Sequence, residues 1–168
     1  MRALALIVAS TLMATAEPPP PGVRRQLRSM NLSQKVAQLV VIPVYGDAPN
    51  VRSREYQEFV RLVRDTRVGG LILINRVRNR VLRRAEPYAF AAFLNRMQRL
   101  AKTPLIVAGD FERGASMRVE STTLFPHAMA FAAGGDLEAT RYAGRVTARE
   151  SRALGVHWVL YPVADVNN

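Results

Sequence analysis

The sequence predicts an α/β fold with a parallel sheet, because two kinds of segment alternate along its 168 residues. Residues 68–74 and 105–108 are apolar or glycine at every position, which is typical of strands buried on both faces of a parallel sheet. Residues 55–63 and 88–100 instead carry apolar side chains at the spacing of an amphipathic helix. Strands joined by such helices, with right-handed crossovers, build a parallel sheet or a barrel.

The first helix is expected to begin near Ser33, whose hydroxyl is suited to cap it. Its apolar face would carry Val36 and Leu39. Residues 39–44 are also β-branched and apolar, and the turn-forming residues 46–50 follow them. Helix and strand therefore both remain open for this segment.

The later elements follow the same alternation. Residues 103–104 end the second amphipathic helix, and a less regular stretch covers 110–126. A long helix is predicted over 137–154 and a further strand over 156–161. The sequence thus predicts three or four strands. A complete (β/α)₈ barrel needs about 250 residues, so the chain could form about half of a barrel. An open doubly wound domain would also fit its length.

The N-terminus predicts export. Residues 1–16 combine Arg2, an apolar stretch and small residues before a cleavage point, as a signal peptide does. The alternative is an uncleaved membrane anchor. Residues 17–28 begin with a proline run that cannot continue a helix, so we expect a Pro-rich linker there and the folded domain over 29–168. No later apolar run is long enough to cross a bilayer, and cysteine is absent.

The chain is basic, with a formal net charge of +11 carried almost entirely by arginine. Such a charge can indicate an anionic partner such as nucleic acid. The one dense basic run, residues 76–84, has no interleaved aromatic residues for base stacking and fits no nucleic-acid motif. We therefore expect a solvated loop or helix start there, and no nucleic-acid partner.

Carboxylates follow two of the predicted strands. Asp110 and Glu112 come directly after the strand that ends at Ala108, and Asp165 follows the strand that ends at Tyr161. Functional groups of parallel α/β proteins gather beyond the carboxyl ends of their strands. A carboxylate there can bind vicinal sugar hydroxyls or act as an acid, base or nucleophile. The alternative is a structural carboxylate, which is equally open for Asp110 and favoured for Asp165.

Other kinds of site lack support in the sequence. His127 and His157 stand alone, outside any metal-ligand spacing, so we expect both to be packing residues and expect no metal site. No nucleophile elbow, phosphate loop or dinucleotide fingerprint follows a strand. Phosphoryl transfer and nicotinamide chemistry are therefore not indicated.

Six short motifs follow one another along residues 31–168. They are Asn31–Leu39, Gly69–Leu73, Leu94–Gln98, Asp110 with Glu112, Gly114 and Arg118, Thr123–Ala130, and Gly155 with Trp158, Pro162, Val163, Asp165, Val166 and Asn167. In this order they resemble the N-terminal half of the barrel domain of family 3 glycoside hydrolases, especially bacterial β-N-acetylhexosaminidases. No single motif is decisive, but their succession is specific.

The resemblance implies the N-terminal half of a (β/α)₈ TIM-like barrel from an enzyme that cleaves terminal β-linked N-acetylhexosamine or glucose with retention, through a covalent intermediate and without a cofactor. Asp110 would correspond to the acid that binds hydroxyls of the non-reducing sugar, and Arg118 to a nearby substrate-contacting arginine. Glu112 and Asp165 would be structural residues near the site. Arg113 departs from the family, which often has glycine there.

The resemblance also places the sugar-binding Lys-His pair, the acid/base and the nucleophile of the family beyond residue 168. We therefore expect no catalytic residues in this chain, no activity of the isolated chain, and self-association through open barrel edges. Two other functions remain open: a self-contained non-catalytic carbohydrate-binding module that uses Asp110 and Arg118, and a basic protein that binds an anionic polymer through residues 76–84.

Overall fold

The computed structural model describes residues 18–46 and 48–163, and the chain divides into two units, residues 1–31 and 32–168. The predicted signal peptide, residues 1–16, lies outside the described residues. In the first unit, helix α1 (Pro21–Ser29) begins within the segment predicted to be a linker. Pro21 can open this helix because the first helical residue needs no N–H donor.

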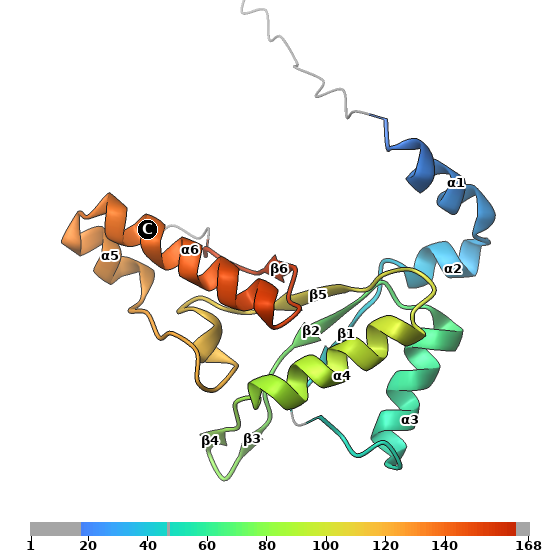
Figure 1. The fold of residues 1–168 in the computed structure, drawn as a ribbon, viewed down its shortest axis with the longest axis horizontal. Coiled ribbons are helices and arrows are strands. Elements are labelled where there is room, and N and C mark those ends of the chain that lie inside the picture. The colour runs from blue at the N-terminus through green and yellow to red at the C-terminus, as the bar shows by residue number, and fades with distance from the viewer. Residues whose placement is uncertain (1–17, 47, 164–168) are drawn as a thin grey trace, which may run out of the picture. The chain divides into compact units, whose positions relative to one another are not determined.

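The second unit alternates strands and helices, as predicted. In chain order its described elements are α2 (Leu32–Ala37), β1 (Val41–Val44), α3 (Arg54–Val60), the π-helical turn η1 (Arg61–Thr66), β2 (Gly70–Leu73), β3 (Val77–Arg78), β4 (Val81–Leu82), α4 (Pro87–Leu100), β5 (Ile106–Gly109), the 3₁₀ helix η2 (Ala115–Met117), α5 (Ala128–Gly134), α6 (Leu137–Ala153) and β6 (Trp158–Val159). The main sheet has the order β1-β2-β5-β6, and every neighbouring pair is parallel (Figure 1).

One face of this sheet carries the hydrophobic core. Leu71, Leu73 and Val107 point to this face and are completely buried. Helix α4 lies across this part of the sheet in Figure 1, beside α3. Phe93 of α4 meets Phe59 of α3 edge to face, with ring centroids 5.3 Å apart. The core therefore forms where the amphipathic helices cover the apolar strands, which is the packing that such strands require.

The opposite face of the sheet is partly open. Val41, Gly70 and Ile106 lie side by side in register across three strands. Neighbours in register point to the same face of a sheet, and Val41 and Ile106 are 40% and 51% exposed. A Cβ on Gly70 would lie 2.4 Å from the carbonyl oxygen of Ile106, so only glycine allows this close approach.

Pro43 lies in the edge strand β1, where its missing N–H does no harm. On the side of β2, the amide of Gly70 donates to the carbonyl oxygen of Val40, and the amide of Ile74 donates to that of Val44. Residues of even number in β1 therefore pair with β2, and Pro43 faces the outer edge. Proline is tolerated in sheets at such edge positions because no ladder hydrogen bond is lost.

The predicted first helix needs correction. Helix α2 begins at Leu32, so Ser33 is its second residue and does not occupy the cap position. The apolar face expected from Val36 and Leu39 is not buried: their exposed fractions are 54% and 84%. Of the two structures left open for residues 39–44, the strand is the one that forms, as β1.

The sequence predicted a solvated loop or a helix start for the arginine-rich run, residues 76–84. The structure shows neither of these there. Strands β3 and β4 pair antiparallel as a small hairpin. Asn79 and Arg80 between them both have positive φ, at 52° and 63°. Positive φ at both central residues is what a tight hairpin turn of type I′ requires, and asparagine adopts it more readily than most residues.

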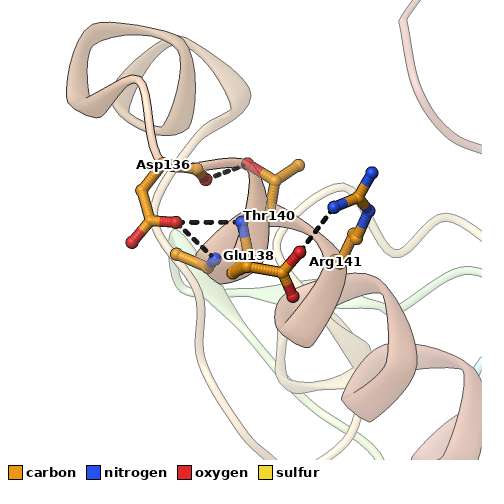
Figure 2. A network of polar contacts seen from close by, with 5 residues as sticks. Asp136, Glu138, Thr140 and Arg141 are labelled. Carbon is orange, nitrogen blue, oxygen red and sulfur yellow. Dashed lines mark hydrogen bonds and ion pairs between the residues drawn. The ribbon is translucent and has the colours of Figure 1, made fainter.

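Helix α6 begins at a well-formed cap (Figure 2). The carboxylate of Asp136 accepts hydrogen bonds from the amides of Glu138 and Ala139, at 2.9 and 3.0 Å. The hydroxyl of Thr140 donates to the Asp136 carbonyl oxygen at 2.9 Å, and Arg141 pairs with Glu138. The two hydrogen bonds to the Asp136 carboxylate satisfy amides that have no partner inside the helix.

None of the helices in the described part of the chain has the length and apolar character needed to cross a membrane.

Candidate sugar-binding site

The candidate site is built on the carboxyl end of β5. Asp110 directly follows this strand, and Arg118 lies eight residues later, after η2. The Arg118 Nη2 atom donates to Asp110 Oδ2 at 2.5 Å, and Arg118 Nε donates to the Asp110 carbonyl oxygen at 3.3 Å. The side chains are 15% exposed for Arg118 and 30% for Asp110. Both residues predicted to bind substrate are thus brought into direct contact.

The main chain of Arg118 is anchored from two other elements. Its carbonyl oxygen accepts from Asn75 Nδ2 at 3.0 Å and from the amide of Ala85 at 2.8 Å. Asn75 follows β2, and Ala85 lies just before α4. The loop that carries Arg118 is therefore attached to the end of β2 and to the start of α4. These attachments fix the position of the Arg118 backbone, from which its guanidinium extends.

Asn75 was not identified from the sequence. Its Oδ1 atom is buried, and within the described residues it has no hydrogen-bond partner. The one signal in the sequence was position, because Asn75 comes soon after the apolar residues of β2, where functional groups gather. Nothing in the spacing indicated that its amide would reach a residue 43 positions away.

Glu112 and Arg113 follow Asp110 in sequence but make their contacts elsewhere. Glu112 lines two neighbouring hollows with Tyr161, one of which also includes His127. Arg113 Nε donates to the Phe125 carbonyl oxygen at 3.2 Å, and the Phe125 amide donates back to the Arg113 carbonyl oxygen at 3.0 Å. Arg113 therefore closes the loop from 113 to 125 through its side chain and its main chain.

His157 takes part in the pairing of the last two strands of the main sheet. His157 Nδ1 accepts a hydrogen bond from the Val107 amide at 3.1 Å, and the His157 amide donates to the Val107 carbonyl oxygen at 2.8 Å. His157 is exposed as a residue, but partial desolvation of its ring, and after it the charge of Arg152, lower the pKa of His157 below its ordinary value. The neutral imidazole thus extends the pairing of β5 with β6.

Metal ligation has no support in the described residues, where no group of three or more acidic, histidine or cysteine side chains gathers. Asp165, which the sequence singled out as a structural residue near the site, lies outside the described residues.

The family model described as "Glycosyl hydrolase family 3 N terminal domain" matches residues 31–168. A beta-N-acetylglucosaminidase/beta-glucosidase of Cellulomonas fimi is 34% identical over 145 residues, which are 86% of this chain and 23% of that protein. A periplasmic beta-glucosidase of Salmonella typhimurium is 30% identical over 141 residues, 84% of this chain and 16% of that protein. The chain thus spans under a quarter of the length of these curated relatives.

Solved structures show the same fold. The beta-glucoside phosphorylase BglX bound to 2FGlc aligns with a TM-score of 0.69 at 24% identity, over 86% of this chain and 24% of that one. Native NagZ from Neisseria gonorrhoeae aligns with a TM-score of 0.53 at 21% identity, over 76% of this chain and 36% of that one. These neighbours are TIM-barrel enzymes matched over their N-terminal portion, so the predicted half of a (β/α)₈ barrel is confirmed.

Proposed function

Because this chain belongs to the glycosyl hydrolase family 3 N-terminal domain family, we propose that residues 29–168 form the sugar-holding half of the barrel of a retaining β-glycosidase. The proposed substrates are terminal β-linked N-acetylhexosamine or glucose residues. The names of the two curated relatives support this choice, since both include beta-glucosidase and one includes beta-N-acetylglucosaminidase.

The observation that carries the proposal is the Asp110–Arg118 pair at the carboxyl end of β5. Arg118 engages Oδ2 of Asp110, and no described residue hydrogen-bonds to Oδ1, which is proposed to accept from a ligand. A carboxylate held by a guanidinium through one oxygen accepts hydrogen bonds on its other oxygen in a fixed direction. Vicinal hydroxyls of a pyranose supply two donors at suitable spacing. Asp110 is therefore proposed to bind sugar hydroxyls, and Arg118 to orient it and contact the sugar.

We propose that these residues bind the sugar without cleaving it. Retaining hydrolysis needs two groups beside the scissile bond, with carboxyls about 5–5.5 Å apart. Glu112, the nearest acid in sequence, lines hollows with His127 and Tyr161, whereas Asp110 is engaged by Arg118. The nucleophile and the acid/base are accordingly assigned to the part of the relatives' length that this chain does not cover.

A second candidate function is a carbohydrate-binding module that acts alone. The same clamped carboxylate favours it, because sugar binding requires no second acid. The two functions differ in what happens when the missing length of a relative is supplied as a second polypeptide. A barrel half would gain hydrolytic activity, and a self-contained module would not.

Export is part of the proposal. Residues 1–16 have the composition of a signal peptide. One relative carries the word periplasmic in its name. Residues 17–28 are proposed to link the cleavage point to the barrel half. N-terminal sequencing of the chain from a bacterial periplasm should begin at residue 17, and a retained Met1 in that fraction would contradict cleavage.

Calorimetric titration of the purified chain with N-acetylglucosamine and with glucose tests the proposed function. We expect Asp110→Asn to weaken sugar binding about tenfold, the loss of one charge-assisted hydrogen bond. Asp65→Asn is the matched control, because Asp65 pairs only with Arg64 on the surface of η1 among the described residues. Equal sugar affinity of the wild type and Asp110→Asn, or hydrolysis of an aryl β-N-acetylglucosaminide by the pure chain, would overturn the proposal.

A further inference from the structure

A cavity of about 430 Å³ lies beside the candidate site, at the same end of the sheet. Its walls come from the segments after β1 and β2, from the stretch between the hairpin and α4, and from the loop after η2. The lining residues are Tyr45, Gly46, Arg76, Arg83, Arg84, Glu86, Ala89 and Glu120. The hairpin and the start of α4 meet at this end of the sheet in Figure 1.

Much of the charge in this cavity is already engaged. Arg76 pairs with Glu55 at 2.5 Å and lies over the ring of Tyr45, 4.0 Å from its centroid. The carboxylate of Glu86 caps α4 by accepting from the amides of its first turn, at 3.1 and 2.6 Å. Each oxygen of the Glu86 carboxylate therefore already accepts one hydrogen bond from the start of α4, while the group keeps its negative charge.

Two arginines keep donors that no residue in the described part of the chain uses. Arg84 donates from Nη1 to the carbonyl oxygen of Ser116 at 3.2 Å, which is the one hydrogen bond of its guanidinium among the described residues. Within the described residues the Arg83 side chain makes no hydrogen bond or ion pair. Against these two cations stand two exposed carboxylates of the lining, that of Glu120 and that of Glu86, which is held at the helix cap. The cavity thus has an excess of guanidinium donors.

Gly46, another lining residue, passes close to the hydrophobic core. Gly46 has a φ of +83°, and a Cβ there would lie 2.6 Å from the Cβ of Ala85. Because Ala85 is buried, a larger residue at this position would collide with the core, so the chain can pass Ala85 only with glycine here. Ala85 in turn pairs with the sugar-site loop: its amide donates to Arg118, and its carbonyl oxygen accepts from Glu120, both at 2.8 Å.

We propose that this cavity binds an oxyanion next to the sugar held by Asp110. Guanidinium groups match planar or tetrahedral oxyanions because they present paired donors in a rigid fork. Glu120 lines the cavity two residues after Arg118, and Ala85 holds both by backbone hydrogen bonds, so the oxyanion is proposed to lie on or beside the bound sugar. It is either the carboxylate of an acidic sugar or free inorganic phosphate. The position relative to the sugar rests on the proposed function, whereas oxyanion binding itself does not.

Titration of the chain with inorganic phosphate, with D-glucuronate and with D-glucose tests this inference. We expect an oxyanion to bind and to bind more weakly as NaCl is raised, and we expect R83Q/R84Q to lose about tenfold in affinity. R99Q is the matched control, since Arg99 is an exposed arginine of α4 that does not line the cavity. No oxyanion binding at millimolar concentration, or equal loss in R83Q/R84Q and R99Q, overturns the inference.

The three probes also distinguish the source of the oxyanion. Tighter binding of glucuronate than of both glucose and phosphate identifies an acidic sugar. Phosphate binding, with glucuronate no better than glucose, identifies a free anion. Asp110→Asn should weaken glucose binding and leave phosphate binding unchanged. Failure of that substitution to affect glucose would therefore count against the sugar site alone, and loss of phosphate binding in R83Q/R84Q would still support the cavity.

Discussion

Arg118 holds both the side chain and the main chain of Asp110 with one guanidinium. Nη2 reaches the carboxylate at 2.5 Å and Nε reaches the carbonyl oxygen at 3.3 Å. Two contacts from one planar group fix the carboxylate in direction as well as in position. A lysine offers one ammonium on a flexible stem and cannot reproduce this geometry.

Arg118→Lys should therefore weaken sugar binding about tenfold while the chain stays folded, because one directed contact to Asp110 is lost. Calorimetric titration with N-acetylglucosamine measures the affinity, and far-UV circular dichroism checks the fold. Arg113→Lys is the matched control, since Arg113 lies on the same loop but donates to Phe125. A loss in Arg113→Lys equal to that in Arg118→Lys would assign the effect to loop stability and not to Asp110.

The cap of α6 gives a prediction about stability. Asp136→Ala removes the carboxylate that accepts from the amides of Glu138 and Ala139 and should lower the free energy of unfolding by about 1 kcal/mol. Urea unfolding followed by circular dichroism measures this. Glu138→Gln should cost less, because it breaks only an exposed ion pair with Arg141. The order of the two losses is the test, and its reversal would contradict the role of the cap.

His157 should make the stability depend on pH. Its pKa is lower in the folded chain than in the unfolded one, where the value is about 6.5. The unfolded state therefore binds a proton first as the pH falls. The stabilising contribution is complete above the unfolded pKa and is lost as the pH falls from about 6.5 toward the folded value. We expect the melting temperature to decrease between pH 7.5 and pH 5.5.

His157→Asn tests the origin of this slope, because an asparagine oxygen can accept the Val107 amide without titrating. Its melting temperature should change less over this pH range than that of the wild type. His127→Asn, the same substitution at the other histidine of the chain, is the variant for comparison. Equal slopes in all three proteins would show that other groups cause the pH dependence.

Local sequence patterns were sufficient for the strands and long helices of the second unit. The apolar residues of β2 and β5 predict buried parallel strands because their character does not depend on what lies around them. The hairpin of β3 and β4 escaped prediction, since Asn79 and Arg80 lie within a charged run and their positive φ is a backbone property. Leu39 was expected in a core and is exposed, because nothing in the described part of the chain covers it.

The candidate site was predictable in its parts but not in its connections. The resemblance singled out Asp110 and Arg118 separately, and the loop between them brings their side chains together. Asn75 reaches Arg118 only because β2 and β5 are neighbours in the sheet. Contacts of this kind follow from the order of the strands, which local patterns do not specify.

The open face of the sheet predicts self-association. Val41 and Ile106 flank Gly70 on the face of the sheet opposite the core, and they are 40% and 51% exposed. Pro43 removes one donor from the outer edge of β1, which disfavours the addition of another strand there. Burial of the apolar face is therefore a stronger reason for association than edge pairing, since apolar area is what water disfavours.

Substitution with lysine on this face should shift the chain toward the monomer. Val41→Lys/Ile106→Lys places two charges that a second copy would have to bury, which costs far more than their exposure to water. Sedimentation velocity at increasing protein concentration measures the distribution of species. Met129→Lys is the matched control, because Met129 is 83% exposed on α5 and outside the sheet. If Met129→Lys dissociates the assembly as well as the double variant does, the contact lies at the end of the molecule that carries α5, and the sheet face is not what holds the copies together.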